Sequence, residues 1–461
     1  MFFRALLLLS STAAAQPPQP SAAECGALAS AGAFSPIVIS NSRGLVAHVL
    51  PYGGTVQRLL VPTADGGLLD IVQGFDDGAD YCRNSFAPNG EHPYYGALIG
   101  RIANRIANCS FVLGGVTYTP PCNEFQVATG LNDTLHGGPR GYDRRVWTAT
   151  PSVDGSSVTL VLNSADMEEG FPSSISVTVT YTMVEPDTNA PQGALGGWDI
   201  TYVTKNTGLL PTIAAHTQHT YWMLSGFTGG ESTVLSHTLQ MPNASSWQEV
   251  DAGLIPTGRL RSVTGADAYM SFQGGKPIGT DIVPGVGLPS GAVGYDNSFL
   301  FRKDLSSGEF SPQVVLTAAV ANLQMTVFTD QPAVQVYSGN FLDSSIPRKA
   351  SQGAGLFYDR YSAVALETQQ RIGSSNDPAL QPAITLQSGE THSTRTAYMF
   401  QRLAAPPPAS PSNSSSTVSL PVAISGFALA GIFFVALVIF IAQSRATRGP
   451  VNDDAFYQSV N

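Results

Sequence analysis

Three polar segments far apart in this 461-residue chain carry side chains that could move protons. His136 precedes two glycines, His219 precedes a Tyr-Trp pair, and Glu367 ends an apolar run. An imidazole has an ordinary pKa of about 6.5, and burial raises the pKa of a carboxyl, so both groups can exchange protons near neutral pH. Together the three side chains could serve as general acid and base on a small molecule.

Each of the three also has a structural interpretation. His136 could be a turn histidine held by local hydrogen bonds, His219 a core residue packed beside aromatics, and Glu367 a surface carboxylate at a strand end. His216 lies three residues before His219 and suggests a His-x-x-His metal site. Positions three apart on an alternating strand face opposite sides, which disfavours shared ligation. The spacing of His216 and His219 therefore argues against a metal site at this pair.

Two further residues are candidates for holding a hydroxylated ligand. Arg105 offers N–H donors, and Asp296 offers carboxylate oxygens as acceptors. Arg101 is a rival to Arg105, because two arginines so close together are typical of structural ion pairs.

The elements that position these residues are predicted to be β-strands. Residues 175–183 place apolar side chains at every second position with hydroxyls between them, which indicates a strand with one buried face. Similar runs surround Leu160, Met325 and Val336, and Gly and Pro interrupt the chain about every ten residues, as antiparallel sheets require. We predict an all-β domain over residues 16–403, with many strands in two stacked sheets.

The two ends of the chain predict a membrane protein. Residues 1–15 have the layout of a secretory signal peptide, with Arg4, a leucine run and a small-residue cleavage site. Residues 404–419 are a Pro/Ser-rich stalk, and residues 420–442 are free of charge and long enough for a transmembrane helix. Arg445 and Arg448 follow, which places the tail 443–461 in the cytoplasm and predicts a single-pass type I protein. A lipid-anchor signal is the alternative.

The net charge and the cysteines indicate what kind of protein this is. The net charge of −10 argues against nucleic-acid binding, which needs a basic surface. Four cysteines allow three pairings, and we favour Cys109 with Cys122 across a hairpin and Cys25 with Cys82. Glycosylation sequons are typical of the same exported compartment and begin at Asn108, Asn132, Asn243 and Asn413.

Several segments, in order, resemble the aldose 1-epimerase (galactose mutarotase) family. Residues 100–107 read Gly-Arg-Ile-Ala-Asn-Arg-Ile-Ala, and residues 135–138 read Leu-His-Gly-Gly. Glu-Gly-Phe-Pro follows at 169–172, Tyr-Asp at 295–296, and Leu-Glu-Thr-Gln at 366–369. The resemblance is colinear from about residue 40 to residue 402.

The resemblance implies a β-supersandwich that interconverts the α and β anomers of a free aldose such as galactose or glucose, without a metal or cofactor. It implies that Glu367 removes the proton of the anomeric hydroxyl, that His219 protonates the ring oxygen, and that His136 supports the same oxygen. The residues that match the family's hydroxyl-binding positions are Asn104, Arg105, Asp296 and Gln335.

The chain departs from the family pattern at Gln218, where Asn is usual, at Asn297, where His is usual, and after Glu367, where a Pro-Asp pair is usual. These departures leave the preferred sugar open. Two other functions remain: a sugar-binding receptor on the same fold that has lost turnover, and a hexose-phosphate epimerase, which would need more basic residues. A glycoside hydrolase is disfavoured because it needs two opposed carboxylates.

Overall fold

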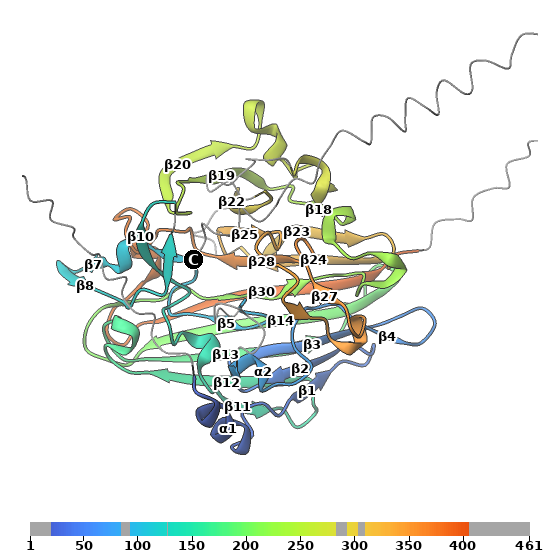
Figure 1. The fold of residues 1–461 in the computed structure, drawn as a ribbon, viewed down its shortest axis with the longest axis horizontal. Coiled ribbons are helices and arrows are strands. Elements are labelled where there is room, and N and C mark those ends of the chain that lie inside the picture. The colour runs from blue at the N-terminus through green and yellow to red at the C-terminus, as the bar shows by residue number, and fades with distance from the viewer. Residues whose placement is uncertain (1–19, 84–92, 127, 283–292, 303–308, 405–461) are drawn as a thin grey trace, which may run out of the picture. The chain divides into compact units, whose positions relative to one another are not determined.

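The structure, a computed structural model, describes residues 20–83, 93–126, 128–282, 293–302 and 309–404. Strands dominate these residues (Figure 1). The clearest predicted strand is β13 (Ile175–Val184), whose side chains alternate between buried and half-buried along its whole length. This alternation follows from the side-chain period of two, because one face of the strand packs into the core. The prediction of a mostly β fold is confirmed.

The larger sheet joins nine of the described strands, all antiparallel. At its centre β14 (Ala194–Asn206) pairs with β30 (Thr391–Arg402) over eleven positions of register. In spatial order the other strands are β11 (Thr148–Pro151), β12 (Ser157–Ser164) and β13 on one side, and β24 (Leu323–Thr329), β23 (Ser311–Ala318), β18 (Thr238–Gln240) and β21 (Lys276–Pro277) on the other.

A second antiparallel sheet joins six of the described strands. Its order is β17 (Tyr221–Trp222), β28 (Val364–Gln369), β25 (Ala333–Tyr337), β22 (Asp296–Phe301), β19 (Ala244–Val250) and β20 (Pro256–Ser262). The two sheets pack against each other: Trp222 of β17 lies 4.7 Å, between ring centroids, from Tyr398 of β30, and the Thr368 and Thr396 hydroxyls are 2.6 Å apart. In Figure 1, β25 and β28 lie above β30 and β14.

Smaller antiparallel sheets complete the described fold, and several of the predicted site residues lie on their strands or directly beside them. One contains β6 (Arg105–Ile106), β10 (Leu131–Leu135) and β9 (Glu124–Gln126), and another contains β1 (Ile37–Ser40), β2 (Val46–Leu50), β3 (Thr55–Pro62) and β4 (Leu68–Asp70). The two-stranded pairs are β5 (Leu98–Ile99) with β16 (Thr217–Gln218), β7 (Phe111–Leu113) with β8 (Val116–Tyr118), β15 (Thr212–Ile213) with β29 (Thr385–Leu386), and β26 (Ile346–Pro347) with β27 (Phe357–Tyr358).

One part of the expected architecture is wrong. In the described part of the chain, no helix is long and apolar enough to cross a membrane. The two α-helices there are α1 (Ala22–Ser30), of nine residues, and α2 (Asp80–Arg83). At about 1.5 Å per residue α1 extends about 14 Å, less than half of a hydrocarbon core. The predicted transmembrane helix, and with it the single-pass type I placement with its domain outside, is therefore corrected.

The segments on which that prediction rested, 1–15, 405–419, 420–442 and 443–461, lie outside the described residues. The predicted cysteine pairing is confirmed. Cys25 of α1 is bonded to Cys82 of α2, and Cys109 is bonded to Cys122.

Candidate active site

Glu367 lies on β28, inside the six-stranded sheet, between β17 and β25. Its neighbour Thr368 points into the core between the two large sheets, where its hydroxyl contacts that of Thr396. Since successive side chains of a strand point to opposite faces, Glu367 points away from the nine-stranded sheet. Only 2% of Glu367 is exposed. A carboxyl is therefore held on a rigid strand, out of bulk water.

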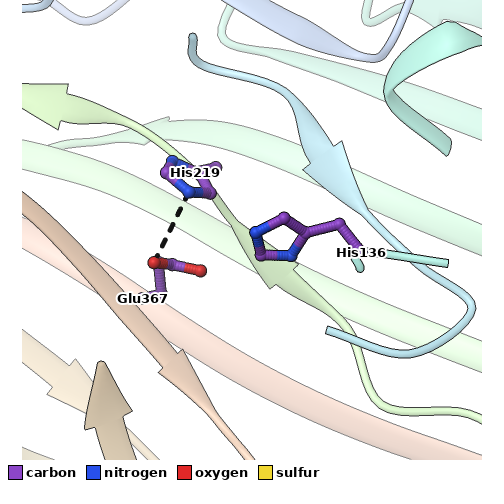
Figure 2. A group of neighbouring side chains, drawn as sticks. All are labelled: His136, His219 and Glu367. Atoms are coloured by element: carbon purple, nitrogen blue, oxygen red, sulfur yellow. Dashed lines mark ion pairs between the residues drawn. The ribbon is translucent and has the colours of Figure 1, made fainter. Parts of the chain in front are cut away.

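His219 lies between the two-residue strands β16 and β17. Its N–H donates to the Ala97 carbonyl at 3.0 Å, and its own carbonyl accepts from the Gly96 N–H at 3.0 Å. Gln218, where the family pattern has Asn, donates from its side-chain amide to the Gly96 carbonyl at 2.6 Å. These bonds fix the backbone of His219, and its Nε2 lies 3.5 Å from Glu367 Oε1 (Figure 2).

His136 follows β10 directly and adopts a left-handed backbone conformation, with φ of 52°. Two bonds join it to Asn104: the His136 N–H donates to the Asn104 carbonyl, and the Asn104 N–H donates to His136 Nδ1, both at 3.1 Å. A neutral imidazole carries one hydrogen, so an accepting Nδ1 places that hydrogen on Nε2. His136 is thus fixed as an Nε2–H donor.

The three side chains come from three separate segments, namely the turn after β10, the residues between β16 and β17, and β28, and they meet at one place (Figure 2). One nitrogen or oxygen from each lies within 4.8 Å of those from the other two. The centroids of the two imidazole rings are 5.2 Å apart, and the rings are nearly perpendicular. Tyr94 contacts both, with its ring centroid 4.6 Å from that of His136 and 5.8 Å from that of His219. Sequence reasoning did not select Tyr94, because no local pattern distinguishes it from other tyrosines.

Burial shifts the pKa of all three groups in the direction that favours the neutral form of each. Burial raises the pKa of Glu367 well above its ordinary value, and the negative charge of Asp296 raises it further, against the opposing effect of Arg105. Burial lowers the pKa of His219 to about 4. Burial also lowers the pKa of His136 well below its usual range, and positive charge on His219 and Arg105 adds to this. The shifts therefore favour the neutral form of both His219 and Glu367, a state in which the pair holds one proton, on the carboxyl.

The same three residues are close enough to ligate a metal ion. Ligation by His136 would need a lone pair on Nε2, because Nδ1 already accepts from the Asn104 N–H. In this arrangement Nε2 carries the ring hydrogen. The donor set suits proton transfer better than metal binding.

The four residues predicted to hold hydroxyls surround this cluster. Arg105 begins β6 and donates from Nε and from one terminal nitrogen to the two Glu124 oxygens, at 2.8 and 2.7 Å. The Asn104 side-chain oxygen accepts from the Arg105 N–H at 2.9 Å. Gln335 is directly opposite Glu367 in the sheet register and donates to Asp296 Oδ1 at 2.6 Å. Arg105 and Asp296 are both near enough to shift the pKa of Glu367.

The rival residues lie elsewhere. The buried guanidinium of Arg101 donates to the Pro172, Ser173 and Ala165 carbonyls and to the Ser164 hydroxyl, so its contacts are structural. His216 contacts the Thr204 hydroxyl through Nε2 at 2.7 Å, and is not part of the cluster of His136, His219 and Glu367.

The chain is similar to known proteins over most of its length. A family model described as aldose 1-epimerase matches residues 35–399. The chain is 32% identical to a galactose mutarotase of Mus musculus, over 77% of this chain and 91% of that protein, and 31% identical to an aldose 1-epimerase of Escherichia coli, over 79% and 94%. Among solved structures, a GalM/aldose epimerase homologue from C. elegans has 27% identity and a TM-score of 0.64, covering 80% of this chain and 99% of that one.

Proposed function

We propose that this chain, which belongs to the aldose 1-epimerase family and is an isomerase, interconverts the α and β anomers of a free hexose such as galactose or glucose. In this proposal Glu367 is the base, His219 is the acid and His136 is a hydrogen-bond donor. The observation that supports this most is the 3.5 Å contact between a buried imidazole and a buried carboxyl, with the His136 Nε2–H beside them.

Ring opening needs two proton transfers. The Glu367 carboxylate takes the proton from the anomeric hydroxyl, the His219 imidazolium gives a proton to the ring oxygen, and the bond between C1 and the ring oxygen breaks to leave an aldehyde. After rotation about C1–C2 the ring closes from the other face, and the two protons return. His136 donates from Nε2 to the ring oxygen, where charge develops.

The burial of Glu367 and His219 assists this reaction. Before ring opening, Glu367 is ionised and His219 is protonated; after it, both are neutral, and the number of protons on the pair is unchanged. Burial favours the neutral forms, as the raised pKa of Glu367 and the lowered pKa of His219 indicate. Desolvation therefore favours the open-chain side of the step, and each transfer contributes a factor on the order of 100 to 10,000.

Four residues are proposed to hold the sugar's hydroxyls. Arg105 donates from hydrogens that Glu124 does not take, Asp296 accepts, and the amides Asn104 and Gln335 do either. Asp296 and Gln335 are already bonded to each other at 2.6 Å, so a hydroxyl joins an ordered acceptor rather than a loose one. The preferred hexose depends on how these groups match axial and equatorial hydroxyls.

The test is polarimetry on freshly dissolved α-galactose and α-glucose. Glu367→Gln keeps the size of the side chain but removes the base, and we expect the enzyme-dependent rate to fall about 100-fold or more. Glu390→Gln is the matched control, because that carboxylate is exposed and contacts only His392 and the Gln387 N–H among the described residues. A wild-type rate in Glu367→Gln would refute the proposal. Sugar binding by calorimetry without faster mutarotation in the wild type would support the receptor alternative.

A further inference from the structure

A short segment beside the site contacts both the proposed sugar-binding arginine and the strand that leads to His136. Glu124, at the start of β9, binds the Arg105 guanidinium through two oxygens at 2.8 and 2.7 Å. The Arg105 side chain is 9% exposed and that of Glu124 is 21% exposed. Two parallel N–H···O bonds fix the plane of a guanidinium as well as its position.

This pairing determines which Arg105 hydrogens can reach a ligand. An arginine has five N–H hydrogens. Glu124 takes one on Nε and one on a terminal nitrogen, and Asn104 Oδ1 lies 3.5 Å from the other terminal nitrogen. The end of the guanidinium that faces away from Glu124 keeps one hydrogen on each terminal nitrogen. Glu124 therefore selects the edge that Arg105 presents.

The residue before Glu124 binds the strand β10. Asn123 donates from its side chain to the Leu135 carbonyl at 3.0 Å, and its side-chain oxygen accepts from the Leu135 N–H at 2.7 Å. Its backbone N–H also donates to the Asp133 carbonyl at 3.1 Å. Leu135 is the residue immediately before His136, so one dipeptide is bonded to both sides of the site.

The disulfide Cys109–Cys122 anchors this dipeptide. Cys122 directly precedes Asn123, and Cys109 ends the short 3-10 helix Ala107–Cys109 that follows β6, the strand of Arg105. The bond therefore joins the segment that carries Arg105 to the segment that carries its partner.

We propose that Glu124 is a positioning residue for sugar binding by Arg105, and that the Cys109–Cys122 disulfide holds Glu124 in place. The inference rests on the proposed role of Arg105 in binding the sugar. It gives this disulfide a function at the site and not only in stability.

The first experiment is a double-mutant cycle on steady-state mutarotation of galactose. Glu124→Gln should raise KM about tenfold, as expected for a lost charged hydrogen bond, and change kcat less than about threefold. Arg105→Ala should raise KM by itself, and Glu124→Gln should add almost nothing to it, because Glu124 acts only through Arg105. An unchanged KM in Glu124→Gln, or fully additive effects, would overturn the proposal. Absence of turnover in the wild type would instead remove the proposed function.

The second experiment compares the two disulfides. Cys109→Ser with Cys122→Ser should raise KM by a factor similar to that of Glu124→Gln. The matched control, Cys25→Ser with Cys82→Ser, removes a bond between α1 and α2 and should leave KM unchanged. Both variants are assayed at a temperature where near-ultraviolet circular dichroism shows native packing. A wild-type KM in the first variant, or equal increases in both, would contradict the role assigned to Cys109–Cys122.

Discussion

At the scale of single residues, the site depends on where its hydrogens lie. The backbone N–H of Asn104 fixes the hydrogen of His136 on Nε2, and Glu367 lies 3.5 Å from His219, so that the protonation of one side chain affects the other. An enzyme that transfers two protons in one step needs the pair in a single protonation state, since a second proton blocks the base and the loss of the first removes the acid. Burial widens the pH range in which that state is populated, because it moves the two pKa values in directions that favour neutrality.

The pH dependence of kcat/KM follows. On the acid side, the rate should fall as the pH drops through the pKa of His219, which burial lowers to about 4. Below this pH both side chains are protonated, so Glu367 can no longer act as the base. On the alkaline side, the rate should fall only above the raised pKa of Glu367, where the pair holds no proton. Polarimetry from acid to alkaline pH, with the uncatalysed rate subtracted, measures both limbs. An acid limb at the ordinary imidazole pKa of about 6.5 would contradict this account.

Sequence reasoning selected the three residues that meet at the site, but not the groups that contact them. His136, His219 and Glu367 belong to motifs that can be recognised in order along the chain. Glu124 and Tyr94 belong to no motif, and only the contacts with Arg105 and the two imidazoles distinguish them. Contacts between distant segments depend on the packing of loops, which no local pattern of residue types determines.

At the scale of elements, the site is built where strands end. Asn104 and His136 both have left-handed backbone conformations, with φ of 62° and 52°, and each hydrogen-bonds the other. Such conformations cost about 1 to 2 kcal/mol in residues other than glycine. Gly137 continues the turn with φ of 90° and lies against the peptide of Gly100, so the backbone approaches too closely for any side chain.

Gly137→Ala should therefore damage both stability and activity. The added Cβ would overlap the Gly100 carbonyl oxygen, and we expect a loss of about 3 kcal/mol in the free energy of unfolding, together with a lower kcat as His136 shifts. Gly130→Ala is the matched control at the other end of β10: its φ is 70°, but no atom lies within 4 Å of an added Cβ. It should cost about 1 to 2 kcal/mol and leave kcat unchanged. Urea unfolding and polarimetry measure the two quantities, and equal effects of the two substitutions would count against this role of Gly137.

The long strands were predictable and the short ones were not. The ten residues of β13 show the period-two pattern plainly, and so do β12 and β24. The strands next to the site, β5, β6, β16 and β17, have two residues each, too few for any periodicity. They are held by pairing with distant partners, so their place follows from the assembled sheets.

At the scale of the whole described fold, the two large sheets pack against each other. The segments that carry His136 and His219 lie against the six-stranded sheet, beside Glu367. The predicted β class follows from alternation along many strands, whereas the predicted membrane anchor rested on residues outside this fold. The two disulfides act at different distances along the chain. Cys25–Cys82 spans 57 residues and joins two helices, while Cys109–Cys122 spans 13 residues beside the site.

The two disulfides should rank in opposite orders for their effect on stability, which depends on loop length, and for their effect on KM, which depends on location. Cross-linking removes more entropy from the unfolded chain when the loop is longer, so loss of Cys25–Cys82 should cost about 4 kcal/mol and loss of Cys109–Cys122 about 3 kcal/mol. The KM for galactose should rank the other way, because only Cys109–Cys122 adjoins Glu124. Urea unfolding and steady-state polarimetry on the same two double-serine variants separate the effects. If the variant with the larger loss of stability also had the larger KM, the disulfide beside the site would be acting through stability alone.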